Sequence, residues 1–317
     1  MKTKSYLTTI GITLIMTNLV TTSSALAQPP RMKMTTEIPQ SITAPDKVET
    51  PIGTLEYFDG VPTAETVEDV YDYLDRSRAV NVFLNSLPAI SMYTLREGQA
   101  GIGADASNKI AIWDTLMDST TLLLTGNTST MYAVGFLDLA KDGPTVIALP
   151  PRMLGVLDDM AFHYMTDLGV AGPDQGKGGK FLVLPPGYKG DVPDGYFVVP
   201  SKTNGVWVFT RGYIDKGIKA ASENIRNNLK VYPLAKKDTP PTMEFINVSG
   251  KKMNTILPND YTFFEKLHDL IQQEPDDFLG PEAKGMMAAI GIEKGKPFNP
   301  DERMKKILTD AAAIGNA

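Results

Sequence analysis

The hydrophobic pattern changes its period along the chain. Between residues 64 and 96 apolar side chains recur at helical spacing, at Val67, Val70, Tyr71 and Leu74 and then at Val80, Phe83, Leu84 and Leu87. Thr63 or Thr66 is expected to cap the start of this segment, and Gly98 is expected to end it. Because Pro88 interrupts the pattern, we expect either two helices or one kinked helix.

From residue 120 the pattern becomes that of β-strands. Short apolar runs rich in β-branched and aromatic residues alternate with Gly, Pro, Asn and Asp, as in TLLLTGNTSTMYAVGFLDLAKDGPTVIALPP. Irregular strands at this spacing favour a sandwich or jelly roll over a parallel α/β sheet. Residues 132–139 and 145–149 are expected to form a hairpin that turns at Asp142 and Gly143. Residues 216–230 return to a helical pattern.

The remainder of the chain is helical in pattern. Three segments after residue 258 each open with a helix-start signal and end near Gly or Pro. We therefore predict an α+β protein, mainly β. An extended lead-in covers residues 28–62, and a β domain preceded by helices covers residues 63–240. A helical connector covers residues 241–317.

Residues 1–27 have the pattern of a secretory signal peptide. Lys2 and Lys4 precede an apolar stretch, and Ala25-Leu26-Ala27 fits the small-x-small rule for cleavage before Gln28. An uncleaved anchor helix is the alternative, although the stretch is short and rich in threonine for about 20 membrane residues. No later segment has a membrane-spanning pattern. A periplasmic or secreted bacterial protein is expected.

The amino-acid composition excludes several kinds of functional site. The chain has no cysteine, which excludes disulfides, thiolate metal sites and a cysteine nucleophile. Its formal net charge is −6, and the predicted signal peptide contains two of the basic residues and none of the acidic ones. The acidic balance and the lack of a dense Lys/Arg cluster make nucleic acid an improbable partner.

Several separated motifs occur in order along the chain: Asn127-x-x-Thr130-x-Tyr132, Leu137-Asp138-Leu139 followed by Gly143-Pro144, and Pro-Pro-Gly-Tyr-Lys-Gly at residues 185–190. Together they resemble the DUF1254 family, whose members look like secreted or periplasmic proteins. The resemblance implies a jelly-roll-like β domain, usually followed by a second jelly-roll domain called DUF1214, and closed homo-oligomers. The chain departs from the family pattern at Ser129, where many relatives have an aspartate.

The second domain is expected to be lacking, because the chain ends at Ala317 within the helical connector. Without that domain the connector helices have no obvious surface to bury against. We therefore expect exposed apolar area on these helices.

Two groups of residues are candidates for ligand binding. Thr130 and Tyr132 share one face of a predicted strand and, with Asn127 nearby, could hold a polar ligand. Trp207 and Arg211 lie four apart on another strand, where they could stack on a sugar or pair with an anion. The structural alternatives are an Asx turn with a buried tyrosine, and a barrel wall with an ion pair.

Asp159 and His163 are the candidates for acid–base catalysis. If the segment is helical, they are i, i+4 neighbours within a polar cluster that includes Asp158 and Asp167. The chain has only two histidines and no paired-histidine motif, so neither a metal site nor a cofactor is expected. A surface or interface pair is the alternative interpretation.

Three functional hypotheses remain open from the sequence. The first is a self-associating β-barrel protein that binds a small molecule or an oligosaccharide. The second is a hydrolase or lyase with an acid–base site near His163. The third is a structural assembly subunit, an argument from fold alone.

Overall fold

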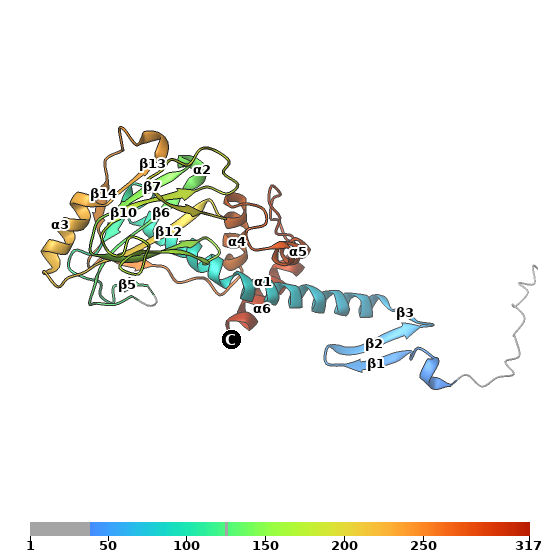
Figure 1. The fold of residues 1–317 in the computed structure, drawn as a ribbon. Helices are drawn as coiled ribbons and strands as arrows, with labels where there is room; N and C mark the ends of the chain where they lie inside the picture. Colours follow the sequence, from blue (N-terminus) through green and yellow to red (C-terminus); the bar gives the residue numbers. More distant parts are fainter. Residues whose placement is uncertain (1–38, 124–125) are drawn as a thin grey trace, which may run out of the picture.

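The computed structural model describes residues 39–123 and 126–317. The signal peptide predicted over residues 1–27 lies outside the described residues. Figure 1 shows a β body, a group of helices beside it, and a long helix that carries a small sheet away from both. Within the described residues, no helix combines the length and the hydrophobicity needed to cross a bilayer.

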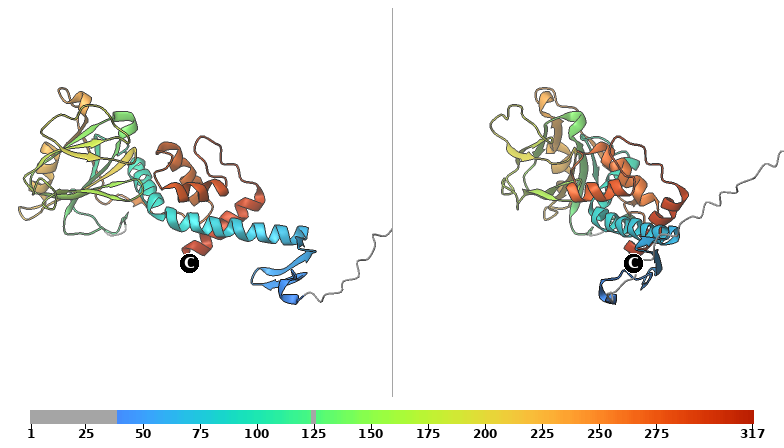
Figure 2. Two further views of the ribbon diagram at one scale, coloured as in Figure 1. Left: turned by 45° about the vertical axis from the view of Figure 1, so that its right-hand side comes forward. Right: turned by 90° about the vertical axis from the view of Figure 1, so that its right-hand side faces the viewer.

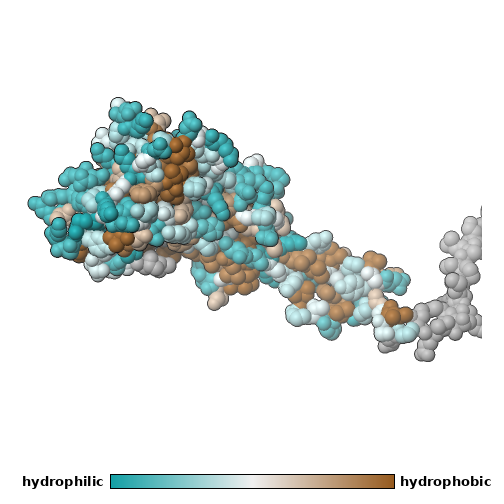
Figure 3. All heavy atoms as spheres, viewed as in Figure 1, coloured by the Kyte–Doolittle hydropathy of each residue, from teal (hydrophilic) through white to brown (hydrophobic). Residues whose placement is uncertain are grey.

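The first described segment is a small antiparallel sheet. A 3₁₀ turn, η1 (Gln40–Ile42), precedes β1 (Lys47–Thr50), β2 (Gly53–Phe58) and β3 (Val61–Pro62). Its strand β2 contacts the long helix that follows. The three strands lie within residues 28–62, so part of the predicted extended lead-in forms a sheet. Figure 3 shows apolar atoms exposed along this part of the molecule, where Phe58 and Val61 are among the most exposed apolar residues.

The long helix is α1 (Ala64–Gly101), one continuous helix of 38 residues. The Thr63 side chain accepts a hydrogen bond from the backbone N–H of Thr66 and caps its start, as expected. Pro88 lies inside the helix, and Figure 2 shows the axis changing direction along its length, so the kinked-helix alternative is the correct one. The expected stop at Gly98 was wrong, because the helix continues to Gly101.

Three further helices pack around α1. They are α4 (Thr262–Gln273), α5 (Pro281–Ala289) and α6 (Glu302–Asn316). Phe263 and Phe264 are fully buried and lie with their ring centroids 4.3 and 6.4 Å from that of Phe83 on α1. The expectation that these helices lack a surface to bury against was therefore wrong, because α1 supplies that surface.

The β body consists of two larger sheets. The four-stranded sheet has the order β11 (Phe197–Pro200), β10 (Gly179–Leu184), β7 (Thr145–Leu149) and β13 (Lys230–Pro233). The six-stranded sheet has the order β14 (Glu244–Asn247), β4 (Lys109–Ile112), β6 (Met131–Asp138), β12 (Gly205–Gly212), β8 (Met153–Asp159) and β9 (Tyr164–Gly169). Most pairs are antiparallel; β10–β11 and β14–β4 are parallel.

Shorter elements complete this part. They are the parallel pair β5 (Thr121–Leu122) and β15 (Met253–Asn254), the helices α2 (Leu139–Asp142) and α3 (Ile218–Asn228), and the 3₁₀ turn η2 (Leu234–Lys236).

The two larger sheets enclose one apolar core. Side chains of alternate residues meet there from both sheets, among them Ala133 of β6, Val208 of β12 and Phe181 of β10. The expected hairpin between residues 132–139 and 145–149 was wrong, because β6 and β7 belong to different sheets. The single helical turn α2 carries the chain from one sheet to the other.

The protein is therefore α+β with mostly antiparallel sheets. The expectation of a mainly β protein was wrong, because helices contribute more described residues than strands do. Most of the helical residues belong to α1 and to the three helices that pack on it.

Candidate functional site

The candidate ligand residues lie on the outer face of the six-stranded sheet, the face turned away from the core between the sheets. Trp207, Phe209 and Arg211 of β12 occupy this face by strand alternation. In the strand register Arg211 is opposite Tyr132 of β6, and Trp207 is opposite Asp158 of β8. Opposed residues point to the same side of a sheet. The outer face is therefore shared by the side chains of Trp207, Phe209, Arg211, Tyr132 and Asp158.

Aromatic rings form a row along this outer face. The Trp207 and Phe209 rings are stacked with centroids 4.5 Å apart, and the Phe209 and Tyr132 centroids are 5.2 Å apart. All three residues are almost fully buried, because this part of the face also packs against the core of the helical body. Beside β8 and β9 the face is half-buried, at residues such as Val156 and Asp167.

Arg211 lies at one end of the aromatic row. Its guanidinium carbon is 5.2 Å from the Tyr132 ring centroid and 5.0 Å from the Phe209 ring centroid. No ion pair joins Arg211 to a carboxylate anywhere in residues 39–123 and 126–317. Its contacts with the two rings orient the guanidinium.

Asn127 and Thr130 lie beside the buried hydroxyl of Tyr132. The backbone N–H and the Nδ2 of Asn127 donate to the Tyr132 hydroxyl at 3.0 and 2.7 Å. The Asn127 side-chain oxygen accepts from the backbone N–H and the hydroxyl of Thr130, both at 3.0 Å. The structure thus brings all five candidate ligand residues into one connected set, in which Asn127 forms an Asx turn that fixes the tyrosine.

Asp158 lies at the other end of the row, opposite Trp207 in the strand register, and is only 7% exposed. Burial, followed by the neighbouring charges of Asp159 and Asp167, raises the pKa of its carboxyl to about 6. No hydrogen bond reaches this carboxyl from any residue that the structure describes. The Trp207 Nε1–H is also buried and has no acceptor among those residues.

Asp159 ends β8 and His163 lies in the turn before β9, at the tip of this hairpin, so the helical arrangement considered from the sequence is not the one found. One oxygen of the Asp159 carboxylate accepts from the backbone N–H groups of Ala161 and His163, at 2.8 and 2.9 Å. The other oxygen lies 3.2 Å from His163 Nδ1. This pair borders a cavity of about 290 Å³. Asp159 therefore organises the tip, and a catalytic role for the pair stays a prediction.

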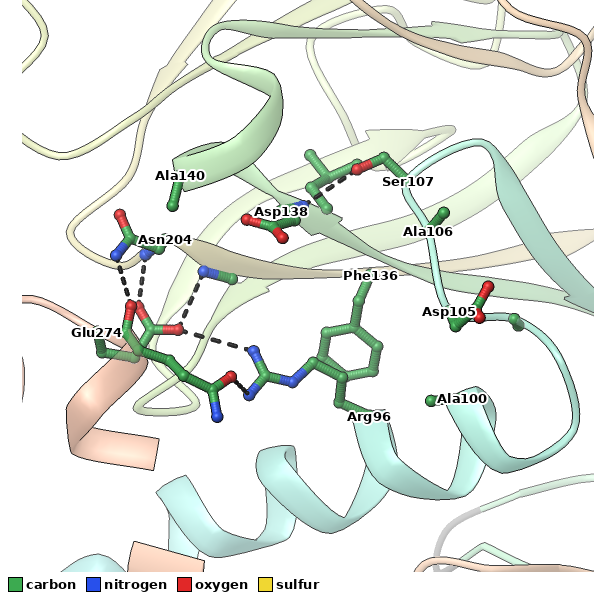
Figure 4. A pocket seen from close by; sticks show the side chains of 14 residues that line it. Arg96, Ala100, Asp105, Ala106, Ser107, Phe136, Asp138, Ala140, Asn204 and Glu274 are labelled. Carbon is green, nitrogen blue, oxygen red and sulfur yellow. Dashed lines mark hydrogen bonds and ion pairs between the residues drawn. The ribbon is translucent and has the colours of Figure 1, made fainter. Parts of the chain in front are cut away.

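A larger cavity of about 420 Å³ lies where α1 and α4 meet β6 and the start of β12. Figure 4 shows Glu274, which follows α4, directed at the backbone of the chain entering β12. The fully buried Glu274 carboxylate accepts from the N–H groups of Asn204 and Gly205, at 2.5 and 3.1 Å. Arg96 lies 3.9 Å from the same carboxylate, and burial raises the pKa of Glu274.

The described residues contain no cluster of three or more carboxylate or imidazole side chains with the geometry of a metal site. The outer face presents aromatic rings, the guanidinium of Arg211, the carboxyls of Asp158 and Asp167, and the indole N–H of Trp207.

Comparison with known proteins identifies the central part of the chain. A family model for a protein of unknown function, DUF1254, matches residues 107–233. Residues 107–233 belong to the DUF1254 family. This DUF1254 segment contains all seven residues that the sequence put forward for ligand binding or catalysis, whereas Arg96 and Glu274 lie outside it.

A search of curated proteins found no match to the chain. Among solved structures, the crystal structure of the VPA0106 protein from Vibrio parahaemolyticus is similar, with 18% sequence identity and a TM-score of 0.46. The similarity covers 74% of this chain and 57% of that chain, so the chain spans little more than half the length of that protein.

Sequence reasoning missed two features of the DUF1254 segment and its surroundings. It placed Asp158 in one polar cluster with Asp159, but on a strand these neighbours point to opposite faces. The alternation in Met153–Asp159 is the signal that could have separated them. No local signal connects Glu274 with Arg96, because their meeting depends on how α4 packs on α1.

Proposed function

We propose that the protein is exported to the bacterial periplasm or secreted and binds a small polar molecule or an oligosaccharide on the outer face of its jelly-roll-like β domain. The observation that carries this proposal is Arg211, a half-buried guanidinium stacked on two rings with no carboxylate partner among the described residues. Because Arg211 is only partly buried and its guanidinium is unpaired within these residues, it is free to donate to an anionic or carbonyl group of a ligand.

The aromatic row supports the same proposal. Ligand sites are lined mainly by apolar and aromatic side chains, with a few polar groups that fix orientation. Here the buried rings of Phe209 and Tyr132 position the guanidinium of Arg211, and Asn127 holds the tyrosine hydroxyl in place. The signal-peptide pattern supports export.

Replacement of Arg211 by alanine is expected to weaken ligand binding by at least about tenfold, the effect of losing one charge-assisted hydrogen bond. Arg211→Lys should also bind weakly, because an ammonium cannot reproduce the planar fork. The measurement is isothermal titration calorimetry with a panel of uronic acids, neutral sugars and small carboxylates.

Arg226 provides the matched control. Its guanidinium also lies over a ring, that of Phe245 at 5.8 Å, but it forms an ion pair with Asp114. Arg226→Ala should therefore leave ligand affinity unchanged. Equal affinities of the wild-type and Arg211→Ala proteins for every ligand that binds would contradict the proposal.

We include self-association in the proposed function because the sheet of β1–β3 and the first turns of α1 leave apolar side chains uncovered (Figure 3). Val67, Tyr71 and Leu74 follow one side of α1 at helical spacing. Sedimentation equilibrium is expected to show a species larger than the monomer, which Tyr71→Glu weakens. A monomer at all concentrations would contradict self-association.

A further inference from the structure

Two unpaired polar groups lie side by side at the Trp207 end of the outer face. Trp207 is 6% exposed and its buried Nε1–H has no acceptor among the described residues. Asp158 is 7% exposed, and no described residue donates to its carboxyl. The two residues are cross-strand partners, whose Cβ atoms lie about 5 Å apart in an antiparallel pair. They nevertheless form no hydrogen bond with each other.

Two buried groups of the same kinds are paired elsewhere in the protein. The other tryptophan, Trp113, is equally buried, and its Nε1–H donates to the Thr121 hydroxyl at 3.1 Å. The buried carboxylate of Asp174 accepts backbone N–H bonds from Gly169 and Gly178 at 2.7 and 3.1 Å. The Trp207 Nε1–H, like Arg76 Nε and Gln99 Oε1, is a buried group without a hydrogen-bond partner among the described residues, and such groups lower stability when left unsatisfied.

Phe162 covers the same corner from the hairpin tip. Its ring stands edge-on to the Trp207 ring with centroids 6.0 Å apart, and 43% of the residue is exposed. Its φ is 64°, in the left-handed region that a bulky residue rarely adopts. The Asp159 carboxylate holds this tip through the N–H groups on either side of Phe162. Such strained conformations persist where neighbouring contacts enforce them, and they cluster at ligand-binding sites.

The indole N–H of Trp207 and the carboxylate of Asp158 determine which ligand groups this corner can bind. A hydroxyl group can accept from the Trp207 Nε1–H and donate to the Asp158 carboxylate, so one hydroxyl or an adjacent pair satisfies both residues. An ammonium group cannot accept from the indole, and an anion is repelled by Asp158, Asp159 and Asp167. The exposed rings of Phe162 and Tyr164 offer apolar surface to the C–H face of a sugar.

We propose that Trp207, Asp158 and Phe162 form a subsite for a neutral, hydroxyl-bearing ring of the kind found in sugars. This subsite rests on the proposed ligand-binding function and specifies its ligand class at the end of the face opposite Arg211. Trp207 donates to a ring hydroxyl, Asp158 accepts from one, and Phe162 stacks beside the ring.

The test is calorimetric titration of the full mature chain with glucose, N-acetylglucosamine and maltose, together with glucosamine and glucuronate as charged counterparts. Neutral sugars are expected to bind at least about tenfold more tightly than glucosamine, whereas glucuronate can also pair with Arg211. Trp207→Phe and Asp158→Asn should each weaken neutral-sugar binding about tenfold, the equivalent of one lost hydrogen bond. Phe162→Ala should also weaken it.

Trp113→Phe is the matched control, because it removes an indole whose N–H is already paired within the protein. This variant should keep the wild-type affinity. The subsite is overturned if no neutral sugar binds at millimolar concentration, if glucosamine binds more tightly than glucose, or if Trp207→Phe binds neutral sugars as the wild type does. Glucuronate binding that depends on Arg211, together with neutral-sugar binding that does not change in Trp207→Phe, would overturn the subsite and leave the proposed function standing.

Discussion

Replacement of Asp158 by asparagine is expected to raise the free energy of unfolding at neutral pH by about 2 kcal/mol. The shift in its pKa from 3.8 to about 6 corresponds to about 3 kcal/mol at about 1.4 kcal/mol per unit, which we reduce because water reaches the edge of the sheet. In a protein of this size the gain corresponds to roughly 5 °C in Tm.

The pH dependence has a defined sign. Below about pH 4 the Asp158 carboxyl is protonated in both the folded and the unfolded protein, and it costs nothing. As the pH rises from about 4 to about 6, the unfolded chain releases this proton first, so the free energy of unfolding falls. Urea denaturation across this range should show that decline in the wild type and a smaller decline in Asp158→Asn.

Asp174 provides the control for Asp158. Its carboxylate is equally buried but accepts two backbone hydrogen bonds, so Asp174→Asn should lose stability by about 1–2 kcal/mol at neutral pH. If Asp158→Asn also destabilises the protein at neutral pH, the carboxyl has a partner in the folded state and the description of this corner is wrong. A stabilising substitution that removes ligand binding is the pattern expected of a functional group.

Glu274→Ala is expected to lower the free energy of unfolding by about 3 kcal/mol. The substitution leaves the N–H groups of Asn204 and Gly205 without their acceptor and Arg96 without its carboxylate. Glu274→Gln keeps one acceptor oxygen and should lose less. Hydrogen exchange should show faster exchange in α4 and at residues 203–205, where the helical body meets the β body.

Glu97 gives the comparison on the surface of the same helix as Arg96. It pairs with Lys266 at 2.5 Å, and its side chain is 43% exposed, so Glu97→Ala should cost less than about 1 kcal/mol. Equal losses for Glu97→Ala and Glu274→Ala would show that Glu274 does not join the two bodies.

Local signals in the sequence predicted the helices and strands better than they predicted which of these elements pair with one another. The Thr63 cap, the kink at Pro88 and the helix later found as α3 follow from spacing and capping chemistry, which act within a few residues. The assignment of β6 and β7 to different sheets was missed. An Asp-Gly turn between two apolar runs favours a hairpin, and only packing between the sheets separates them here.

The sequence predicted only those parts of the candidate site that depend on local pattern. Trp207 and Arg211 share a face because alternation along one strand is local. That Asp158 lies opposite Trp207 depends on the register between β8 and β12, which no pattern within either strand reveals. The left-handed conformation of Phe162 likewise follows from the bonds of Asp159 across the tip.

The most direct test of the account is the nuclear magnetic resonance spectrum of the tryptophan indole N–H groups. The chain contains two tryptophans, so it gives two such signals, which Trp113→Phe assigns. On titration with a neutral sugar the Trp207 signal should move as its N–H gains an acceptor, and the Trp113 signal, already bonded to Thr121, should stay. If the Trp207 signal stays in place with every sugar tested, the outer face does not hold its ligand as described.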